Sequence, residues 1–208
     1  MTTSNLIRRR VDLLRTGEFL RSSDFSKHPR AAVDSALSRL ARKRADLVRV
    51  RNGLYWKGAA SRFGPGRPDE ADAALAAAGP GAGPSGVSAA NALGLSAQVA
   101  AVPSFAVTGR RPTGLRGVRL VSRSNHARRS ATPFEIAVLE VLREYPLHVE
   151  SSWEQLVERL REEAARGRIR IGTVLRVAAC ERNPALRMRA AALRDALMPA
   201  SPPRRKRT

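Results

Sequence analysis

The chain has 208 residues, a formal net charge of +20 and a single cysteine. One cysteine excludes an internal disulfide and a cysteine-based zinc site, and it is typical of a reducing cytosol. No apolar stretch follows the early arginines Arg8, Arg9 and Arg10, and the most apolar run, Val99 to Val107, is short and broken by Pro103. We therefore expect a cytoplasmic protein without a signal peptide or a membrane partner, whose charge attracts polyanions.

The first 60 residues are the most basic part of the chain, with 14 Lys and Arg against 5 Asp and Glu. Three helical segments precede an alternating, β-branched run and a short apolar and aromatic run, joined by Asn-Gly, a pair that favours a type I′ hairpin turn. This is the element order of a winged helix-turn-helix. The predicted elements are a helix from Leu6 to Arg15, a short helix at Ser22–Phe25 capped by a serine, a helix from Pro29 to about Lys43, and a hairpin of Leu47–Arg51 and Leu54–Trp56 around Asn52-Gly53.

The middle of the chain alternates short periodic segments with glycine- and proline-rich stretches, which predict loops. The expected order is a linker at Gly58–Arg67, a helix at Asp69–Ala78, a loop at Gly79–Gly86, a short helix at Val87–Leu93, and strands at Phe105–Thr108 and Gly117–Ser122 around a turn at Arg110–Gly114.

Beyond Asn125 the pattern is helical. Thr132-Pro133-Phe134-Glu135 is a capping box, and Ser151-Ser152-Trp153-Glu154 repeats the device. Two more helices, Ile171–Ala179 and Pro184–Leu197, follow. We therefore predict an α+β chain, which consists of a winged helix-turn-helix over residues 1–60, a mostly helical C-terminal domain with a small β-sheet over residues 61–200, and a basic disordered tail over residues 201–208.

The third predicted helix has an apolar stripe of Val33, Ala36, Leu37 and Leu40, so its opposite side is expected to face DNA. Arginines there can pair with guanine, and serines can meet bases or phosphates. Arg49 and Arg51, two residues apart, are expected on one side of the wing, with Asn52 at its tip. Arg8, Arg9 and Arg10 are expected to contact phosphates. The predicted DNA-binding residues are Arg8, Arg9, Arg10, Ser23, Arg30, Ser35, Ser38, Arg39, Arg42, Arg49, Arg51 and Asn52.

No catalytic, metal or cofactor site is expected. The histidines His28, His126 and His148 lie far apart in sequence, and Cys180 follows an apolar run that favours a buried thiol. His28 is better explained as a cap or a phosphate contact than as a base. The Gly79–Gly86 loop precedes a helix, but it lacks lysine and its two prolines remove backbone donors for phosphate.

Two sets of motifs resemble AbiEi-type antitoxins. Gly17–Leu20 and Ser22–Phe25, then Ala32–Leu40 and Leu47–Tyr55, resemble the N-terminal winged helix of that family. The second set resembles the start of the family's C-terminal antitoxin domain and consists of Pro84–Gly86, Ala89–Val99, Pro103 and Thr108-Gly109. Together they cover about residues 5–120. One departure is the late position of Pro103 after Gln98-Val99.

The resemblance implies that the N-terminal domain represses its own operon by binding promoter repeats. It also implies a cognate nucleotidyltransferase-like toxin, encoded by the adjacent gene, which the C-terminal domain neutralises by sequestration or by modification. The alternative is a stand-alone winged-helix transcriptional regulator with a C-terminal ligand-binding or oligomerisation domain. A modifying enzyme is disfavoured because no catalytic constellation is apparent.

Overall fold

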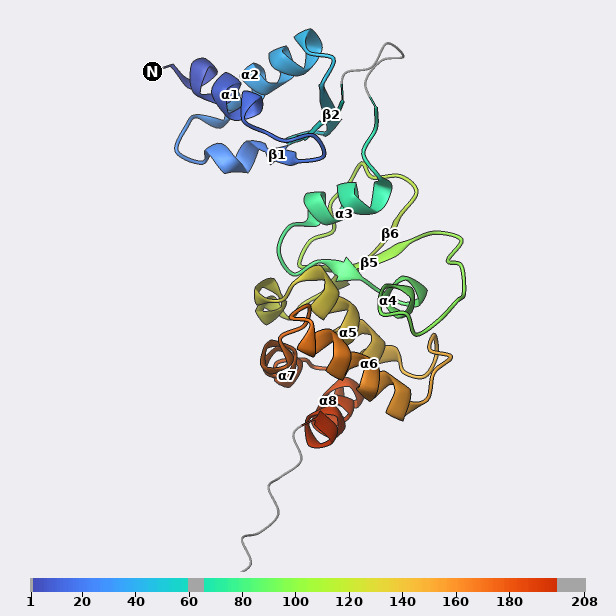
Figure 1. The fold of residues 1–208 in the computed structure, drawn as a ribbon. Helices are drawn as coiled ribbons and strands as arrows, with labels where there is room; N and C mark the ends of the chain where they lie inside the picture. Colours follow the sequence, from blue (N-terminus) through green and yellow to red (C-terminus); the bar gives the residue numbers. More distant parts are fainter. Residues whose placement is uncertain (1, 60–65, 198–208) are drawn as a thin grey trace, which may run out of the picture. The chain divides into compact units, whose positions relative to one another are not determined.

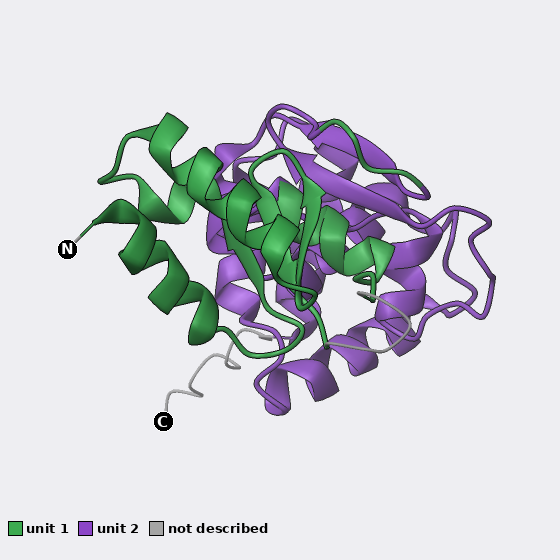
Figure 2. Ribbon diagram, turned by 90° about the horizontal axis from the view of Figure 1, so that it is seen from above, with its two compact units in different colours: residues 1–77, 113–116 green, residues 78–112, 117–208 purple. Residues whose placement is uncertain are grey.

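The computed structural model describes residues 2–59 and 66–197, and this part of the chain is α+β, as predicted. It divides into two compact units, coloured separately in Figure 2. The first comprises residues 1–77 and 113–116, and the second comprises residues 78–112 and 117–208. The division falls after residue 77, whereas the sequence analysis placed it after residue 60. The predicted tail and the centre of the predicted linker lie outside the described residues.

The first unit combines helices with a three-stranded antiparallel sheet of order β1-β3-β2, an arrangement compatible with a winged helix (Figure 1). Its elements are α1 (Thr3–Asp12), β1 (Phe19–Arg21), the 3₁₀ helix η1 (Ser22–Phe25), α2 (Arg30–Lys43), β2 (Leu47–Arg51), β3 (Leu54–Lys57) and α3 (Glu70–Ala78). None of the helices in the described residues is long and apolar enough to cross a bilayer.

Three local features of this unit differ from the sequence prediction. The first helix begins at Thr3 with Thr2 as its N-cap, rather than at Leu6. The N-cap of the short second helix is Arg21 rather than a serine. The Arg21 N–H donates a hydrogen bond to the Asp24 carboxylate at 2.8 Å. The three-residue strand β1 was not predicted. It pairs with β3.

The wing hairpin forms around Asn52-Gly53, but its turn is not type I′. Gly53 has a φ of 74°, whereas no non-glycine residue in the described part has a positive φ, and a type I′ turn needs two. The pairing of β2 with β3 shifts between Arg49 and Arg51, which marks a β-bulge. A bulge increases the local strand twist, so it offsets the missing second positive φ.

The second unit consists of a small sheet and a helical layer. Its elements are β4 (Gly83–Pro84), α4 (Val87–Ala92), β5 (Ser104–Thr108), β6 (Arg119–Arg123), the 3₁₀ helix η2 (His126–Ser130), α5 (Pro133–Glu144), α6 (Trp153–Ala165), α7 (Ile171–Ala179) and α8 (Pro184–Leu197). The predicted Gly79–Gly86 loop contains β4, which pairs antiparallel with β5. Strands β5 and β6 are parallel, so the segment between them is a crossover rather than a simple turn.

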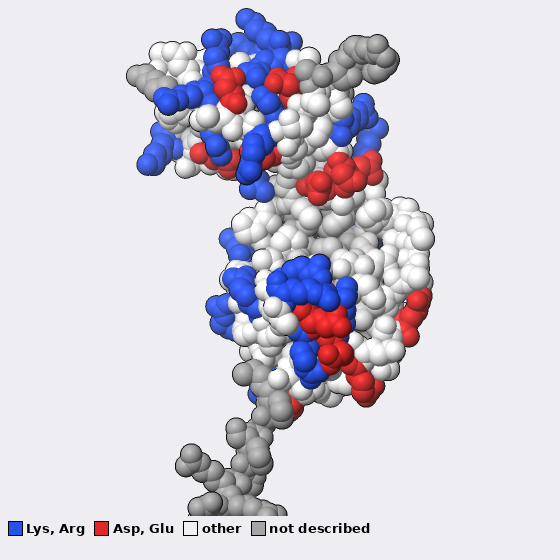
Figure 3. All heavy atoms as spheres, in the orientation of Figure 1, with Lys and Arg blue, Asp and Glu red and all other residues white. Residues whose placement is uncertain are grey.

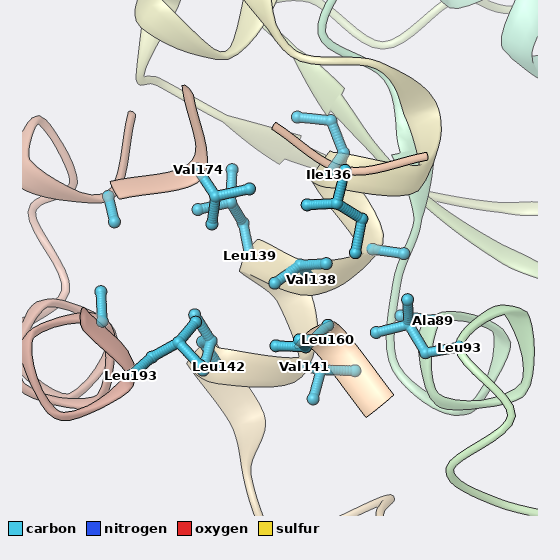
Figure 4. Packing of buried hydrophobic residues seen from close by; sticks show 14 of the residues in the cluster. Ala89, Leu93, Ile136, Val138, Leu139, Val141, Leu142, Leu160, Val174 and Leu193 are labelled. Atoms are coloured by element: carbon cyan, nitrogen blue, oxygen red, sulfur yellow. The ribbon is translucent and has the colours of Figure 1, made fainter. Parts of the chain in front are cut away.

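Helix α5 is the centre of this unit and packs against β4, α4, α7 and α8. Its capping box is as predicted, because Thr132 and Glu135 exchange hydrogen bonds. The second box lies one residue later than predicted and joins Ser152 to Gln155. Figure 4 shows side chains of several elements meeting in the core, among them Leu93 directly after α4, Leu139 and Leu142 of α5, Leu160 of α6, Val174 of α7 and Leu193 of α8, all fully buried.

A network of charged side chains lies beside this core. The Arg128 guanidinium is completely buried and donates to Glu140 Oε1 at 2.7 Å and Glu181 Oε1 at 2.6 Å. Arg123 binds Glu140 from another side, and Arg143 pairs with Glu181. Burial raises the pKa of Glu140, but hydrogen bonds and charge from Arg123 and Arg128 outweigh it, so the pKa lies below its ordinary value.

Candidate nucleic-acid interface

The inner side of α2 packs on the core of the first unit. Val33, Ala36 and Leu37 are at most 2% exposed and pack in one cluster with Ile7 and Val11 of α1. Leu40, the fourth member of the predicted stripe, is half-buried and packs against the same cluster. The predicted orientation of the helix is therefore confirmed, and the opposite side faces solvent.

The outer side of α2 carries the side chains predicted to meet DNA. Ser35, Arg39 and Arg42 are exposed, and Ser38 is half-buried. Arg30, at the first turn, is exposed and lies 3.6 Å from Asp34. A free carboxylate at this position would repel phosphate, but the Asp34 carboxylate is paired with Arg30. It also accepts a hydrogen bond from the Ser22 hydroxyl at 2.6 Å, which connects η1 to the helix.

All five acidic residues of the first 60 are held by nearby groups. Asp24 and Asp34 bind groups already described, and Glu18 pairs with Arg15 at 2.9 Å. Asp12 pairs with Arg44, and Asp46 pairs with Arg44 at 2.9 Å and with Lys57 at 2.7 Å. The hydrogen bond from Arg44 is the largest cause that holds the pKa of Asp46 far below its ordinary value. Four of these carboxylates therefore offset Arg15, Arg30, Arg44 and Lys57, whereas Asp24 binds a backbone N–H.

The remaining predicted arginines carry uncompensated charge. Each lacks an ion pair with any described residue, and together they are Arg8, Arg9, Arg10, Arg39, Arg42, Arg49 and Arg51. All are exposed except Arg51, which is half-buried. On the side of this unit seen in Figure 3, blue basic side chains outnumber red acidic ones. Guanidinium groups in this state can bind phosphate without first breaking a salt bridge.

The two wing arginines do not share one surface as predicted. The Arg49 guanidinium donates to Asn52 Oδ1 at 3.0 Å, across the turn. Arg51 instead lines a hollow that Arg49 does not reach. The cause is the bulge between them, because one extra residue breaks the alternation that places residues i and i+2 on the same side of a strand.

This hollow, of about 450 Å³, lies between η1, the start of α2, the wing and the last turn of α3, and we call it the wing hollow. It brings together four predicted residues, Ser23, Arg30, Arg51 and Asn52, and also His28 and Arg21. Arg21 was missed by sequence reasoning, although a basic residue directly before the short helix was a usable signal. Its Nε donates to the Ala76 carbonyl at 2.8 Å. His28 Nδ1 lies 3.2 Å from Thr3 Oγ1.

The other predicted residues lie outside the wing hollow. Arg8, Arg9 and Arg10 lie on α1, and Arg39 and Arg42 lie on the last half of α2. The prediction for Cys180 was wrong, because the residue is exposed where α7 ends. The apolar run before it ends at Ala179, and the thiol falls on the outer side of the final turn.

Comparison with known proteins finds a distant structural likeness. No family model matches the chain, and no curated protein matches it. Among solved structures, the chain is similar to the RV2827C protein from Mycobacterium tuberculosis, with 18% sequence identity, over 94% of this chain and 76% of that one, at a TM-score of 0.38. A likeness this distant indicates no function for the chain.

Proposed function

We propose that the chain is a DNA-binding autorepressor that also serves as the antitoxin of a toxin–antitoxin pair. The observation that carries the DNA-binding part is the set of seven predicted arginines on α1, α2 and the wing that form no ion pair with any described residue. The antitoxin part is supported by the motif resemblance to AbiEi-type antitoxins, which implies a nucleotidyltransferase-like toxin as the partner.

In the proposed complex, the outer side of α2 enters the major groove of the operator. Arg39 and Arg42 are exposed and unpaired, so either can donate two hydrogen bonds to guanine. Ser35 can reach a base or a phosphate. The wing hollow receives a backbone phosphate through Arg51, and the arginines of α1 contact the flanking backbone, where they set register rather than sequence specificity.

The test of DNA binding compares the fragment upstream of the chain's own gene with scrambled DNA across a salt series. We expect tighter binding to the upstream fragment that persists at moderate salt. Arg42→Gln should weaken operator binding by about 1–3 kcal/mol and weaken scrambled DNA less. The matched control is Arg15→Gln, which removes the same charge from a guanidinium already paired with Glu18.

Two results would refute the repressor proposal. Equal, steeply salt-sensitive binding to both DNAs would mean that the net charge alone explains binding. Equal losses for Arg39→Gln, Arg42→Gln and Arg15→Gln would show that neither exposed arginine on the outer side of α2 reads a base.

The antitoxin proposal is tested by co-expression of the full chain with the product of the adjacent gene. We expect the chain to restore growth that this product inhibits. Because the resemblance assigns neutralisation to the C-terminal domain, a full-length Arg39→Gln/Arg42→Gln variant should lose repression and still restore growth. If the wild-type chain does not restore growth, the antitoxin part is wrong, and a stand-alone regulator becomes the better reading.

A further inference from the structure

The second unit contains a pocket of about 510 Å³ that no part of the DNA-binding proposal uses. Strand β6 forms one wall, and every second residue of the strand contributes to it. Arg119, Val121 and Arg123 all line the pocket, as residues two apart on a regular strand should. Leu147 and His148, just beyond α5, line another side. We call this cavity the β6 pocket.

The charge of the β6 pocket is positive. Among the described residues, Glu144 is the only acidic one in its lining, and it is shared between Arg123 at 3.8 Å and His148 Nε2 at 3.4 Å. Arg123 is also held by the buried Glu140. Arg119 is exposed and forms no ion pair with any described residue, so its guanidinium is available to an anion.

The same pocket has an apolar rim. Val102 is 51% exposed and Leu147 is 72% exposed, which makes them two of the five large apolar side chains exposed in the described part of the chain. Exposed apolar residues gathered around a concave surface are a mark of ligand binding, whereas single ones are ordinary. An inorganic anion would leave these side chains in water. An anion attached to an apolar group would cover them.

The backbone at Gly86 keeps one side of the pocket open. Its φ is +56°, which side-chain-bearing residues rarely adopt. A Cβ built there would lie 3.5 Å from Ser104 Oγ and 3.6 Å from His148 Nε2. A side chain at this position would therefore cover the imidazole edge, and glycine leaves that edge accessible from the pocket.

We propose that the β6 pocket binds a small organic acid, that is, a carboxylate or phosphate monoester joined to a short apolar chain. The Arg119 guanidinium receives the anion, with the His148 imidazole beside it, and Val102 and Leu147 cover the apolar chain. All of these residues belong to the second unit, so the proposal does not depend on the DNA-binding function.

The experiment is NMR titration of the full-length ¹⁵N-labelled chain at constant ionic strength. The probes are hexanoate, hexyl phosphate, inorganic phosphate and hexylamine. We expect one or both organic acids to shift the amide signals of Gly86, Val121 and Leu147 saturably. Inorganic phosphate should bind at least roughly tenfold more weakly, because it buries no apolar surface, and hexylamine should not bind. Which acid binds more tightly distinguishes a carboxylate ligand from a phosphate ester.

Two variants separate this site from general attraction by a basic chain. Arg119→Gln should weaken binding by roughly tenfold or more, since it removes a charge-assisted hydrogen bond. Arg110→Gln is the matched control, because Arg110 is exposed in the same unit, pairs with no described carboxylate and does not line the pocket. Equal weakening by both variants, absence of shifts at the pocket with either organic acid, or equal affinity for inorganic phosphate would each overturn the proposal.

Discussion

The network around Arg128 predicts that two glutamates on the same helix, one turn apart, differ sharply in their contribution to stability. Glu140 is fully buried and binds Arg128 at 2.7 Å and Arg123 at 2.5 Å. Glu140→Gln keeps the shape and removes the charge. It leaves the buried Arg128 with Glu181 as its one remaining carboxylate, although Arg128 Nη2 already has no partner. We expect a loss of about 3–5 kcal/mol in the free energy of unfolding of the second unit.

The control is Glu144→Gln. Glu144 is 33% exposed and lies 3.8 Å from Arg123, so solvent screens its contribution and the expected loss is under about 1 kcal/mol. The chain has two tryptophans, Trp56 in the first unit and Trp153 in the second. Urea unfolding followed by fluorescence in a Trp56→Phe background therefore reports on the second unit alone. If the stability losses of Glu140→Gln and Glu144→Gln agree within about 0.5 kcal/mol, which is the uncertainty of such a comparison, the reasoning is refuted.

The contribution of Glu140 to the free energy of unfolding should depend on pH. Since the pKa of Glu140 in the folded chain lies below its ordinary value of 4.5, its contribution is fully present above pH 4.5 and is lost as the pH falls through the folded pKa. The stability difference between wild type and Glu140→Gln should therefore be constant near neutral pH and narrow below pH 4.5. A difference that widens on acidification would contradict the assigned direction.

Three further predictions concern other parts of the chain. Gly81→Ala should destabilise the second unit by about 1–3 kcal/mol more than Gly79→Ala. Both glycines have a positive φ, but only at Gly81 would a Cβ meet close neighbours, 2.5 Å from Thr108 Oγ1 and 2.9 Å from the Arg129 backbone nitrogen. Equal shifts of the thermal unfolding midpoint for the two variants would contradict this prediction. Thr132→Ala should cost about 1 kcal/mol in urea unfolding through loss of the α5 cap, and Thr132→Ser should restore most of it. Replacing Arg8, Arg9 and Arg10 together by glutamine should weaken operator and scrambled DNA alike and lower the salt-dependence slope by about 3, whereas an unchanged slope would exclude them as phosphate contacts.

Local signals were enough to predict much of the fold. The stripe of Val33, Ala36 and Leu37 fixed the orientation of α2 because three points on a 3.6-residue period determine one side of a helix. The bounds of α7 and α8 were predicted correctly, and the α5 box was found from Thr132 and Glu135 alone, since caps act within one turn.

The features that were missed depend on partners distant in sequence. Strand β4 is two residues long and exists because Gly83 and Pro84 pair with β5, about twenty residues away. The parallel direction of β5 and β6 is set by the path of the crossover, which alternation within each strand does not encode. The contact between Arg128 and Glu181 joins residues 53 apart, and the bulge that separates Arg49 from Arg51 depends on the register with β3.

These observations also bear on how a highly basic chain should be interpreted. The net charge of +20 counts arginines in ion pairs and arginines without them equally. It therefore indicates attraction to polyanions but does not locate a binding surface. On α6, Arg159 and Arg161 each pair with glutamates, so they add little to the field that a polyanion meets. On α2, Asp34 pairs with Arg30, whereas Arg8, Arg9 and Arg10 of α1, Arg39 and Arg42 of α2 and the two wing arginines form no ion pair with any described residue. The pattern of pairing, rather than the total charge, therefore selects the surface on which DNA binding should be tested, and it makes Arg42 and Arg15 the two residues whose comparison is most informative.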